Sequence, residues 1–279
     1  MTPRRFSKPA FSRLERAIAI LAPTAKPEVC PEIGSPSAWA RQHLAFEPSP
    51  KQAQVLDDPA HRLILNCSRQ WGKTTVIAIK ALYEALHNER TTIMVLSRTK
   101  PLAALTIHKV REFAALLGIR RRRFQGREHS VQLPNGSAIF AIAHNAATAV
   151  GNTVHIAIVD EAAVVEDDVF AAILPSISRT KGKLWLLSTP SGPSGMFYKI
   201  WHDHSLGHWT RVTATVDDID YADKEVLHLE TTLFPNRARQ DFYCEFVQPP
   251  GRLVDPALLE RLVNPNIEPI DLDRYRKWP

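Results

Sequence analysis

Cysteine and long apolar runs are scarce in this sequence. Its three cysteines, Cys30, Cys67 and Cys244, lie far apart without metal-ligand spacing, which predicts buried free thiols rather than a disulfide framework. No stretch approaches the roughly 18 apolar residues that a membrane-spanning helix needs. The first eight residues carry three cations, but no apolar core with a small-residue cleavage site follows them. We therefore expect a cytoplasmic protein without a membrane partner.

Proline is rare in the middle of the chain and frequent at its ends. Residues 1–50 hold eight of the 21 prolines and residues 249–279 hold six, whereas the 198 residues between them hold seven. Because proline blocks helix interiors, the ends are predicted to be arms or linkers and the middle to be the compact part. The net charge of +6 favours polyanionic partners but does not separate a DNA-binding protein from an ordinary basic enzyme.

Strand and helix signals alternate along the middle of the chain. This alternation predicts an α/β fold with a mostly parallel sheet and helices on both faces. A hairpin is predicted over 130–143, with Asn135-Gly136 as its two-residue turn. Two short helices are predicted near the start, over 11–21 and over 38–44, the second capped by Ser37. The remaining predicted strands cover 62–67, 91–97, 155–160 and 183–188, and the remaining predicted helices cover 73–86, 102–117 and 167–174.

A phosphate-loop pattern follows the first of these strands and precedes a helix. Residues 67–75 read Cys-Ser-Arg-Gln-Trp-Gly-Lys-Thr-Thr, in which Cys67 replaces the first glycine of the usual G-x-x-x-x-G-K-[ST]. Gly72 lets the backbone wrap closely around phosphate, and the amides at the helix start point at the anion. Lys73 can reach the β- and γ-phosphates, and the Thr74 hydroxyl can bind Mg²⁺. The strand–loop–helix context favours this interpretation over an ordinary helix start.

Arg69 lies inside this loop and admits two interpretations. Its guanidinium could stabilise transition-state charge on the γ-phosphate, as an arginine finger supplied by the same chain. It could equally be a surface arginine that only orders the loop. The residues alone leave both interpretations open.

Acidic and hydroxyl side chains follow two later strands. Asp160 and Glu161 end a buried apolar run, which places them beside the phosphate loop because ligands bind at the carboxyl ends of parallel strands. We predict that Asp160 holds Mg²⁺ and that Glu161 orients and deprotonates the attacking water. The alternative is an ordinary helix N-terminus, where the helix dipole favours acidic residues. Ser188 and Thr189 end the next strand, where hydroxyls can sense the γ-phosphate.

Together these motifs resemble those of phage terminase large subunits, over residues 43 to about 250. The resemblance implies a RecA-like P-loop NTPase core of the ASCE type with a small C-terminal lid subdomain. It rests on five motifs, which are Phe46-x-Pro48-x-Pro50-Lys51-Gln52, Ser68-Arg69-Gln70-x-Gly72-Lys73-Thr74-Thr75, Val159-Asp160-Glu161-Ala162-Ala163, Leu187-Ser188-Thr189-Pro190-x-Gly192 and Phe242-Tyr243-Cys244-Glu245-Phe246.

The resemblance implies a role for each motif. Gln52 would recognise adenine beside Phe46, and Arg69 would be the P-loop arginine of the family, which favours its functional interpretation. Glu161, Arg69 and Lys73 would be catalytic, and Thr74 and Asp160 would hold the metal. The nucleotide-binding set would be Phe46, Gln52, Ser68, Arg69, Gln70, Gly72, Lys73, Thr74, Thr75, Ser188 and Thr189.

The implied organisation is an arm over 1–42, an ATPase core over 43–209, a lid over 210–248 and a tail over 249–279. The implied function is an ATPase motor that uses ATP and Mg²⁺ to drive double-stranded DNA into a procapsid. Its implied partners are the DNA, a terminase small subunit, a portal and further copies of itself in a ring. The expected location is the cytoplasm of the host cell.

Two departures from the family pattern accompany the resemblance. Many relatives carry an arginine-glycine pair before the acidic strand, whereas Ala149-Val150-Gly151 stands here and the arginine is missing. The family usually continues into a nuclease domain, but only 29 residues follow Pro250 and a domain needs roughly 50 or more. We therefore expect no nuclease activity from this chain.

Two other functions and two other features stay open at this stage. A superfamily-two helicase shares the glutamine, the P-loop and the acidic pair but needs a second RecA-like domain. A non-catalytic or decayed prophage paralogue would bind nucleotide or DNA without turnover. The run Arg120 to Arg123 could bind DNA phosphates or could be a solvated loop. His202, His204 and His208 have no standard zinc spacing.

Overall fold

The structure is a computed structural model that describes residues 34–120, 122–143, 153–219 and 223–248. Its centre is a seven-stranded sheet in the order β3-β4-β2-β5-β6-β1-β7. Every pair of neighbours is parallel except β3 and β4, which confirms the predicted mostly parallel sheet. The strands are β1 (Arg62–Cys67), β2 (Thr92–Ser97), β3 (Ser130–Gln132), β4 (Ala138–Ala143), β5 (Ile156–Asp160), β6 (Lys183–Ser188) and β7 (Thr210–Ala214).

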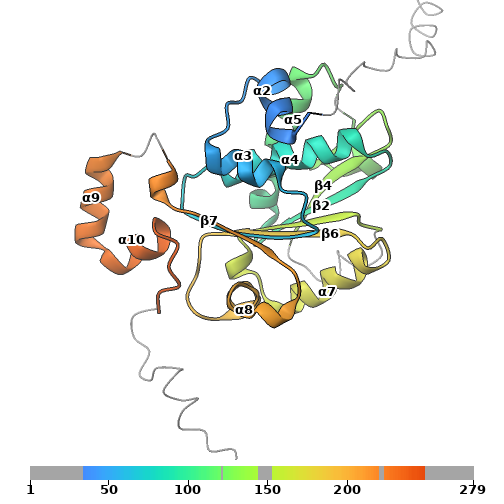
Figure 1. The fold of residues 1–279 in the computed structure, drawn as a ribbon. Coiled ribbons are helices and arrows are strands. Elements are labelled where there is room, and N and C mark those ends of the chain that lie inside the picture. The colour runs from blue at the N-terminus through green and yellow to red at the C-terminus, as the bar shows by residue number, and fades with distance from the viewer. Residues whose placement is uncertain (1–33, 121, 144–152, 220–222, 249–279) are drawn as a thin grey trace, which may run out of the picture.

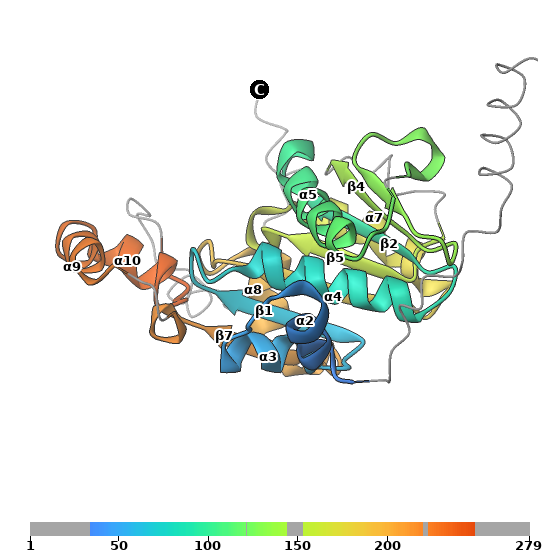
Figure 2. The same ribbon diagram turned by 90° about the horizontal axis from the view of Figure 1, so that it is seen from above.

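Helices cover both faces of this sheet, as the sequence predicts. In Figure 1 the helices α2 to α5 lie on one side of the sheet, α7 and α8 lie on the other, and α9 and α10 stand apart beyond β7. Figure 2 shows from above that α9 and α10 stand apart from the other helices. The helices are α2 (Pro36–Leu44), α3 (Pro50–Asp57), α4 (Lys73–His87), α5 (Lys100–Leu116), α7 (Asp167–Ser178), α8 (Gly195–His202), α9 (Lys224–Leu233) and α10 (Pro235–Asp241), with short 3-10 turns η1 (Phe124–Gly126), η2 (Ala162–Val164), η3 (His204–Leu206) and η4 (Val216–Asp218).

Alternate strand residues supply two separate cores. Leu65, Val95 and Ile158 point into the core under α4 and α5, whereas Leu96 and Val159 point into the core over α7 and α8. Successive strand side chains face opposite sides of a sheet, so a strand buried on both faces is apolar throughout. This explains why the central strands read as unbroken apolar runs. Among the described helices, none is both long and apolar enough to cross a membrane.

Three predicted details are wrong, and the first concerns the hairpin. The hairpin turn is a three-residue connection, because the Leu133 N–H donates to the Ser137 carbonyl and only Gly136 has positive φ, at 84°. A two-residue type I′ turn needs positive φ at both central residues. Asn135 instead donates its side-chain amide to the Ala85 and Leu86 carbonyls at the end of α4.

The helix predicted to end before Pro175 continues through it to Ser178. Proline removes one helical hydrogen bond, but Phe170, Ile173 and Ile177 on this helix are buried against the sheet. Their burial outweighs the lost bond because each buried side chain contributes roughly 1.5–3 kcal/mol. The cap of α2 also differs, since Ser35 caps it and Ser37 bonds Asp57.

The predicted domain limits differ from the packing at two places. Strand β7 pairs along β1 and is part of the sheet, although it begins the predicted lid at residue 210. Helix α2 buries Trp39 and Leu44 in the core, although most of it falls in the predicted arm. The helix predicted over 11–21 lies outside the described residues.

Candidate active site

The carboxyl edge of the sheet gathers the predicted site residues. The strands β1, β5 and β6 are neighbours, and their carboxyl ends lead into the phosphate loop, the acidic pair and the Ser188 motif. The register pairs Asn66 with Ser188 and Asp160 with Leu187. Segments far apart in the sequence therefore meet at one edge, as the order of the motifs predicts.

The phosphate loop depends on glycine at its last turn. Gly72 has φ of 92° and is the N-cap of α4 without any side-chain cap. A Cβ at this position would lie 3.1 Å from the Gln52 Nε2 atom, so both the backbone angle and the space favour glycine. Because no side chain caps the first turn of α4, its amides are available to an anion.

Lys73 begins this helix and reaches the acidic pair. Its Nζ lies 2.9 Å from the Glu161 Oε1 atom, and both side chains are largely buried. Burial is the largest single influence and disfavours the charge of Lys73, but Glu161, Cys67 and Asp160 together outweigh it and raise the pKa of the ammonium. Glu161 has φ of 56°, a left-handed conformation that non-glycine residues rarely adopt. The site therefore holds a fixed cation next to a carboxylate on a strained turn.

Asp160 precedes Glu161 and is more deeply buried. Burial raises the pKa of its carboxyl to about 6, although the Lys73 charge opposes this shift. Its Oδ1 atom accepts the Glu161 N–H at 3.0 Å. A carboxylate here and the Thr74 hydroxyl at the start of α4 are hard oxygen donors of the kind that Mg²⁺ prefers. Two protein donors suit an ion that takes its other ligands from water and phosphate.

Gln52 lies against the phosphate loop. Its Nε2 donates to the Trp71 carbonyl at 2.9 Å, and its Oε1 accepts the Ser49 N–H at 3.0 Å. These bonds join α3 to the loop and hold the amide beside Gly72. Phe46 is partly buried against the same core. Recognition of adenine by these residues stays a prediction.

Arg69 is paired with the α9–α10 segment. Its Nε lies 2.9 Å from the Asp241 Oδ2 atom, and its backbone N–H donates to the Asp241 carbonyl at 2.8 Å. The Asp241 side chain is 3% exposed and also accepts from Arg237 at 3.2 Å. The loop is thus joined to α10 by two bonds from one residue, a contact that the sequence analysis did not predict.

The two strands beside β5 both end on serine, at Ser97 and Ser188. The Ser188 Oγ accepts the Ala163 N–H at 3.1 Å and donates to the Thr189 carbonyl at 2.7 Å, which joins β6 to the turn after Glu161. The hydroxyls of Ser68, Ser97 and Thr189 are buried and make no hydrogen bond within the described structure. Such buried polar atoms are costly unless something pairs with them.

Ser97 was missed by the sequence analysis. It ends β2 one residue after Leu96, whose register partner is Val159, so Ser97 stands beside Asp160 on the next strand. Leu96 and Val159 share one core, so the next residue of each strand faces the opposite side, where α4 lies. The sequence did contain a signal for Ser97, because the apolar runs of β2 and β6 both end on serine.

The arginine run is not brought to this edge. Ala149-Val150-Gly151 lies outside the described residues, so the place of the missing arginine is not defined. Arg122 lies beside β3, where its carbonyl accepts the Gln132 N–H, and the described members of the arginine run, Arg120, Arg122 and Arg123, are exposed. Among the described residues, no group of three His, Cys, Asp or Glu side chains could hold a metal ion.

Comparison with known proteins identifies the family of the chain. The family model for the N-terminal part of the T4-like virus type of terminase large subunit matches residues 64–253. The chain belongs to the terminase large-subunit family. The terminase large subunit of Escherichia phage T5 is 29% identical over 209 residues, which cover 72% of this chain and 48% of that protein. The chain therefore spans about half the length of this curated relative.

Solved terminases share the fold. The large terminase ATPase domain of Thermus phage P74-26 matches with a TM-score of 0.66 at 20% identity, covering 77% of this chain and 100% of that domain. The HK97 bacteriophage large terminase matches with a TM-score of 0.56 at 21% identity, covering 70% of this chain and 46% of that one. The large terminase of a thermophilic bacteriophage, solved with ADP, matches with a TM-score of 0.62 at 18% identity, covering 71% and 54%. These matches confirm the RecA-like terminase ATPase fold.

Proposed function

We propose that this terminase-family chain is the ATP-hydrolysing part of a viral DNA-packaging motor. The observation that carries the proposal is the Lys73–Glu161 pair at 2.9 Å, beside Asp160 at the carboxyl edge of the sheet. In this proposal Lys73 would bind phosphate, Asp160 would bind the metal and Glu161 would act as the base, which are the groups that ATP hydrolysis needs. The motor would act on double-stranded DNA in the host cytoplasm, as a ring of copies with a small subunit and a portal.

Nucleotide binding would use the loop and the start of α4. The uncapped amides after Gly72 and the ammonium of Lys73 would receive the phosphates, and Gln52 with Phe46 would receive the base. The remaining contacts would come from the side chains or amides of Ser68, Arg69, Gln70, Thr74, Thr75, Ser188 and Thr189. A relative of the same fold has been solved with ADP and with ATP-γ-S, which supports a nucleotide at this edge.

Thr74 and Asp160 would hold the magnesium ion that accompanies ATP. The bound ion would neutralise phosphate charge. It would also favour the ionised form of Asp160, because a cation lowers the pKa that burial has raised. The binding of the metal and the deprotonation of this buried acid are therefore coupled.

Hydrolysis would require Lys73 and Glu161 to separate. When phosphate oxygens arrive, they compete with the Glu161 carboxylate for the Lys73 ammonium, and the carboxylate becomes free to contact water. Glu161 then accepts a proton from the water whose oxygen attacks the γ-phosphorus, and the bond to the β-phosphate oxygen breaks. Arg69 would stabilise the charge that develops on the phosphoryl group.

The lid would follow these changes through Arg69. In the described structure its side chain and its backbone N–H both contact Asp241 of α10. If Arg69 moves to the phosphate, the side-chain bond to Asp241 is lost while the loop remains attached to α10 by its backbone. Hydrolysis would in this way change how α9 and α10 are held against the core.

The first test is ATP turnover by the purified chain, with and without double-stranded DNA. We expect turnover by the wild type and none by Lys73→Ala, because the substitution removes the charge that meets the phosphates. Lys109→Ala is a matched control, since Lys109 is an exposed lysine paired with Glu112 on α5. A wild type no faster than Lys73→Ala would exclude the ATPase function and favour a non-catalytic paralogue.

A further inference from the structure

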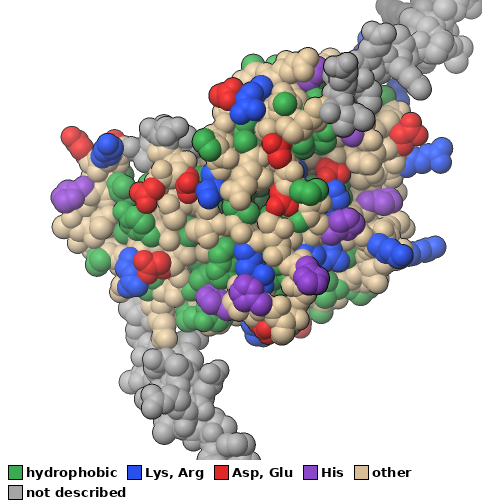
Figure 3. Space-filling view, in the orientation of Figure 1, with side chains coloured by type: hydrophobic (Ala, Val, Ile, Leu, Met, Phe, Trp, Pro, Cys, Tyr) green, Lys and Arg blue, Asp and Glu red, His purple; other side chains and the backbone are tan. Residues whose placement is uncertain are grey.

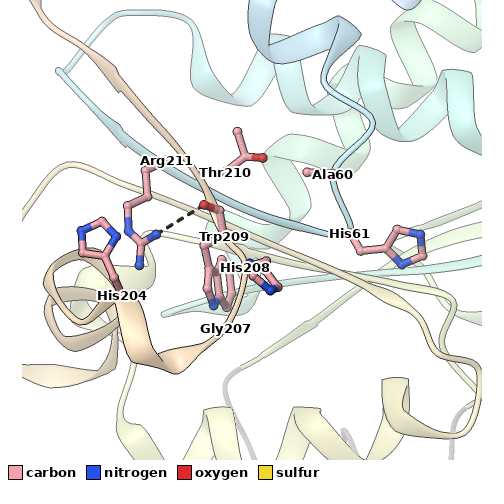
Figure 4. A pocket seen from close by; sticks show the side chains of 8 residues that line it. All are labelled: Ala60, His61, His204, Gly207, His208, Trp209, Thr210 and Arg211. Carbon is pink, nitrogen blue, oxygen red and sulfur yellow. Dashed lines mark hydrogen bonds between the residues drawn. The ribbon is translucent and has the colours of Figure 1, made fainter.

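A groove lies at the amino edge of the sheet, at the ends of the strands opposite to Lys73 and Asp160. One end, about 570 Å³ in volume, is lined by His61, His204, His208 and Arg211 (Figure 4). A second, mainly apolar hollow of about 370 Å³ shares residues 207–209 with it. The two hollows are therefore adjacent, and together they reach from the start of β7 to α7 and α8.

The histidine end of the groove combines three imidazoles with the permanent charge of Arg211. None of its three imidazoles makes a hydrogen bond within the described part of the chain, and no carboxylate lines either hollow. Arg211 donates to the carbonyls of Ile200 and Trp201, at 2.7 and 2.9 Å, which holds its charge in place. Hydrogen bonds from Ser205 lower the pKa of the nearby Asp203, and the charges of His204 and Arg211 help to lower it. Within the described structure, however, Asp203 forms no salt bridge with His204 or Arg211. Histidine and cationic side chains gather over the lower part of the face drawn in Figure 3.

The apolar end of the groove is open to water. Leu174 and Leu206 are 48% and 47% exposed, and Trp209 and Ile200 line the same hollow. Exposed aliphatic side chains that line a concave surface favour aliphatic side chains of a ligand. A ligand that suits both ends would alternate aliphatic residues with carboxylates.

The chain itself contains such a segment. Residues 267–273 read Ile-Glu-Pro-Ile-Asp-Leu-Asp, with three aliphatic side chains, three carboxylates and no cation. We propose that residues 267–273 dock in this groove of the same chain, with their carboxylates at the histidine end and their aliphatic side chains at the apolar end.

The path of the chain leads towards this groove. The Phe246 ring packs on α8, with centroids 5.1 Å from Tyr198 and 5.0 Å from His202. The same helix lines the apolar hollow through Met196 and Ile200. Residues 249–266 follow and can span on the order of 60 Å when extended, at roughly 3.3 Å per residue. The segment therefore reaches the groove without strain.

The strand at this edge can receive an extended segment. Among the described strands, β7 is the last of the sheet, and its first residues Thr210 and Arg211 line the groove. A strand at a sheet edge has unpaired backbone groups on one side, which extended peptides commonly bind. Pro269 is compatible with this position, because proline is tolerated on edge strands.

Two other acidic segments of the chain are alternative occupants of the groove. Residues 27–33 contain Glu28 and Glu32, but they lead directly into Gly34, whose carbonyl accepts the Tyr83 hydroxyl of α4. Helix α4 covers the opposite face of the sheet from α7 and α8. Residues 249–263 precede residues 267–273 in the sequence but mix Arg252 and Arg261 with their acids. Charge and path together favour residues 267–273.

The test is disulfide trapping in the full chain with Cys30 replaced by serine. His208→Cys combined with Ile270→Cys should form an intrachain disulfide at least about tenfold faster than His208→Cys with either Leu258→Cys or Glu28→Cys, because docking raises the local concentration. Peptide mapping by mass spectrometry identifies each product. The two remaining natural cysteines are buried, so they should not compete.

Two further variants test whether charge holds the segment in the groove. Changing Glu268→Gln, Asp271→Asn and Asp273→Asn together should remove the advantage of the 208–270 pair, and His204→Glu should do the same. His204 and His208 are exposed, so the melting temperature should stay that of the parent. Equal trapping of all three pairs, a faster reaction with residue 258 or 28, or disulfides mainly between chains would each overturn the proposal.

Discussion

The Nζ atom of Lys73 and the Oε1 atom of Glu161 lie 2.9 Å apart, so the proposed base is held by the cation that we assign to the phosphates. Glu161→Gln keeps the shape of the side chain but cannot accept a proton. We expect this variant to bind Mg²⁺–ATP nearly as the wild type does and to lose hydrolysis by at least roughly 10²-fold.

Nucleotide titration and phosphate release measure these two effects separately. Glu166→Gln, an exposed acid at the start of α7, is the matched control and should leave both unchanged. Wild-type turnover by Glu161→Gln would show that another residue is the base.

Asp160→Asn should weaken magnesium-dependent nucleotide binding and yet stabilise the nucleotide-free protein at neutral pH. Burial raises the pKa of Asp160 from its ordinary 3.8 to about 6, so the folded state binds the proton more tightly than the unfolded state does. The free energy of unfolding therefore falls as the pH rises from about 3.8 to about 6, and it stays lower above that range. Asparagine avoids this loss, which amounts to at most about 3 kcal/mol.

The stabilisation should depend on pH in a defined way. Melting temperatures of wild type and Asp160→Asn should differ most above pH 6 and converge as the pH falls below 3.8, where the wild-type acid becomes protonated in both states. Asp168→Asn, on the exposed side of α7, provides the control for a surface charge. A lower melting temperature for Asp160→Asn at pH 7.5 would contradict the assignment of an unfavourable buried charge.

The contact between Arg69 and Asp241 should couple the loop to α10 energetically. Asp241 is buried but Arg69 is 58% exposed, so solvent screening limits the pair. A double-mutant cycle with alanine at both positions should give a coupling energy of about 1 kcal/mol in urea unfolding. The exposed pair Arg239 and Glu245, in the same segment, should give less. Equal coupling in the two cycles would mean that Arg69 is merely a surface arginine.

The sequence predicted the elements that depend on local patterns. The strands that end at Cys67, Asp160 and Ser188 were predicted with the correct ends, because buried parallel strands are continuous apolar runs between polar turns. Pro175 was taken for a helix end because the packing of α7 against the sheet is a tertiary effect. The place of β7 in the sheet was missed for the same reason. It pairs with β1, which lies far away in the sequence, and such pairing leaves no local signal.

The site was predictable in part. Motif spacing identified Lys73, Asp160 and Glu161, and the structure brings these residues together as expected. The pairing of Arg69 with Asp241 was not predictable, because nothing in the sequence around an acid at the end of α10 indicates which cation it will meet. Contacts of this kind are set by how separate elements pack.

Ser97 provides the last prediction. Its hydroxyl is buried without a hydrogen bond in the described structure, and β2 places it beside the strand end that carries Asp160. A hydroxyl there can bond the carboxylate or a water of the metal shell, and such partners orient metal ligands. Ser97→Ala should therefore raise the magnesium concentration needed for half-maximal ATP turnover by about 10-fold or more, the usual scale for such partners. Thr106→Val is the matched control. Thr106 also has a buried hydroxyl without a partner in the described structure, but it lies within helix α5 and not at the end of a strand. Magnesium titrations of turnover at saturating ATP, with melting curves to confirm that both variants fold, decide the question. An equal magnesium requirement for the two variants would assign Ser97 to packing alone.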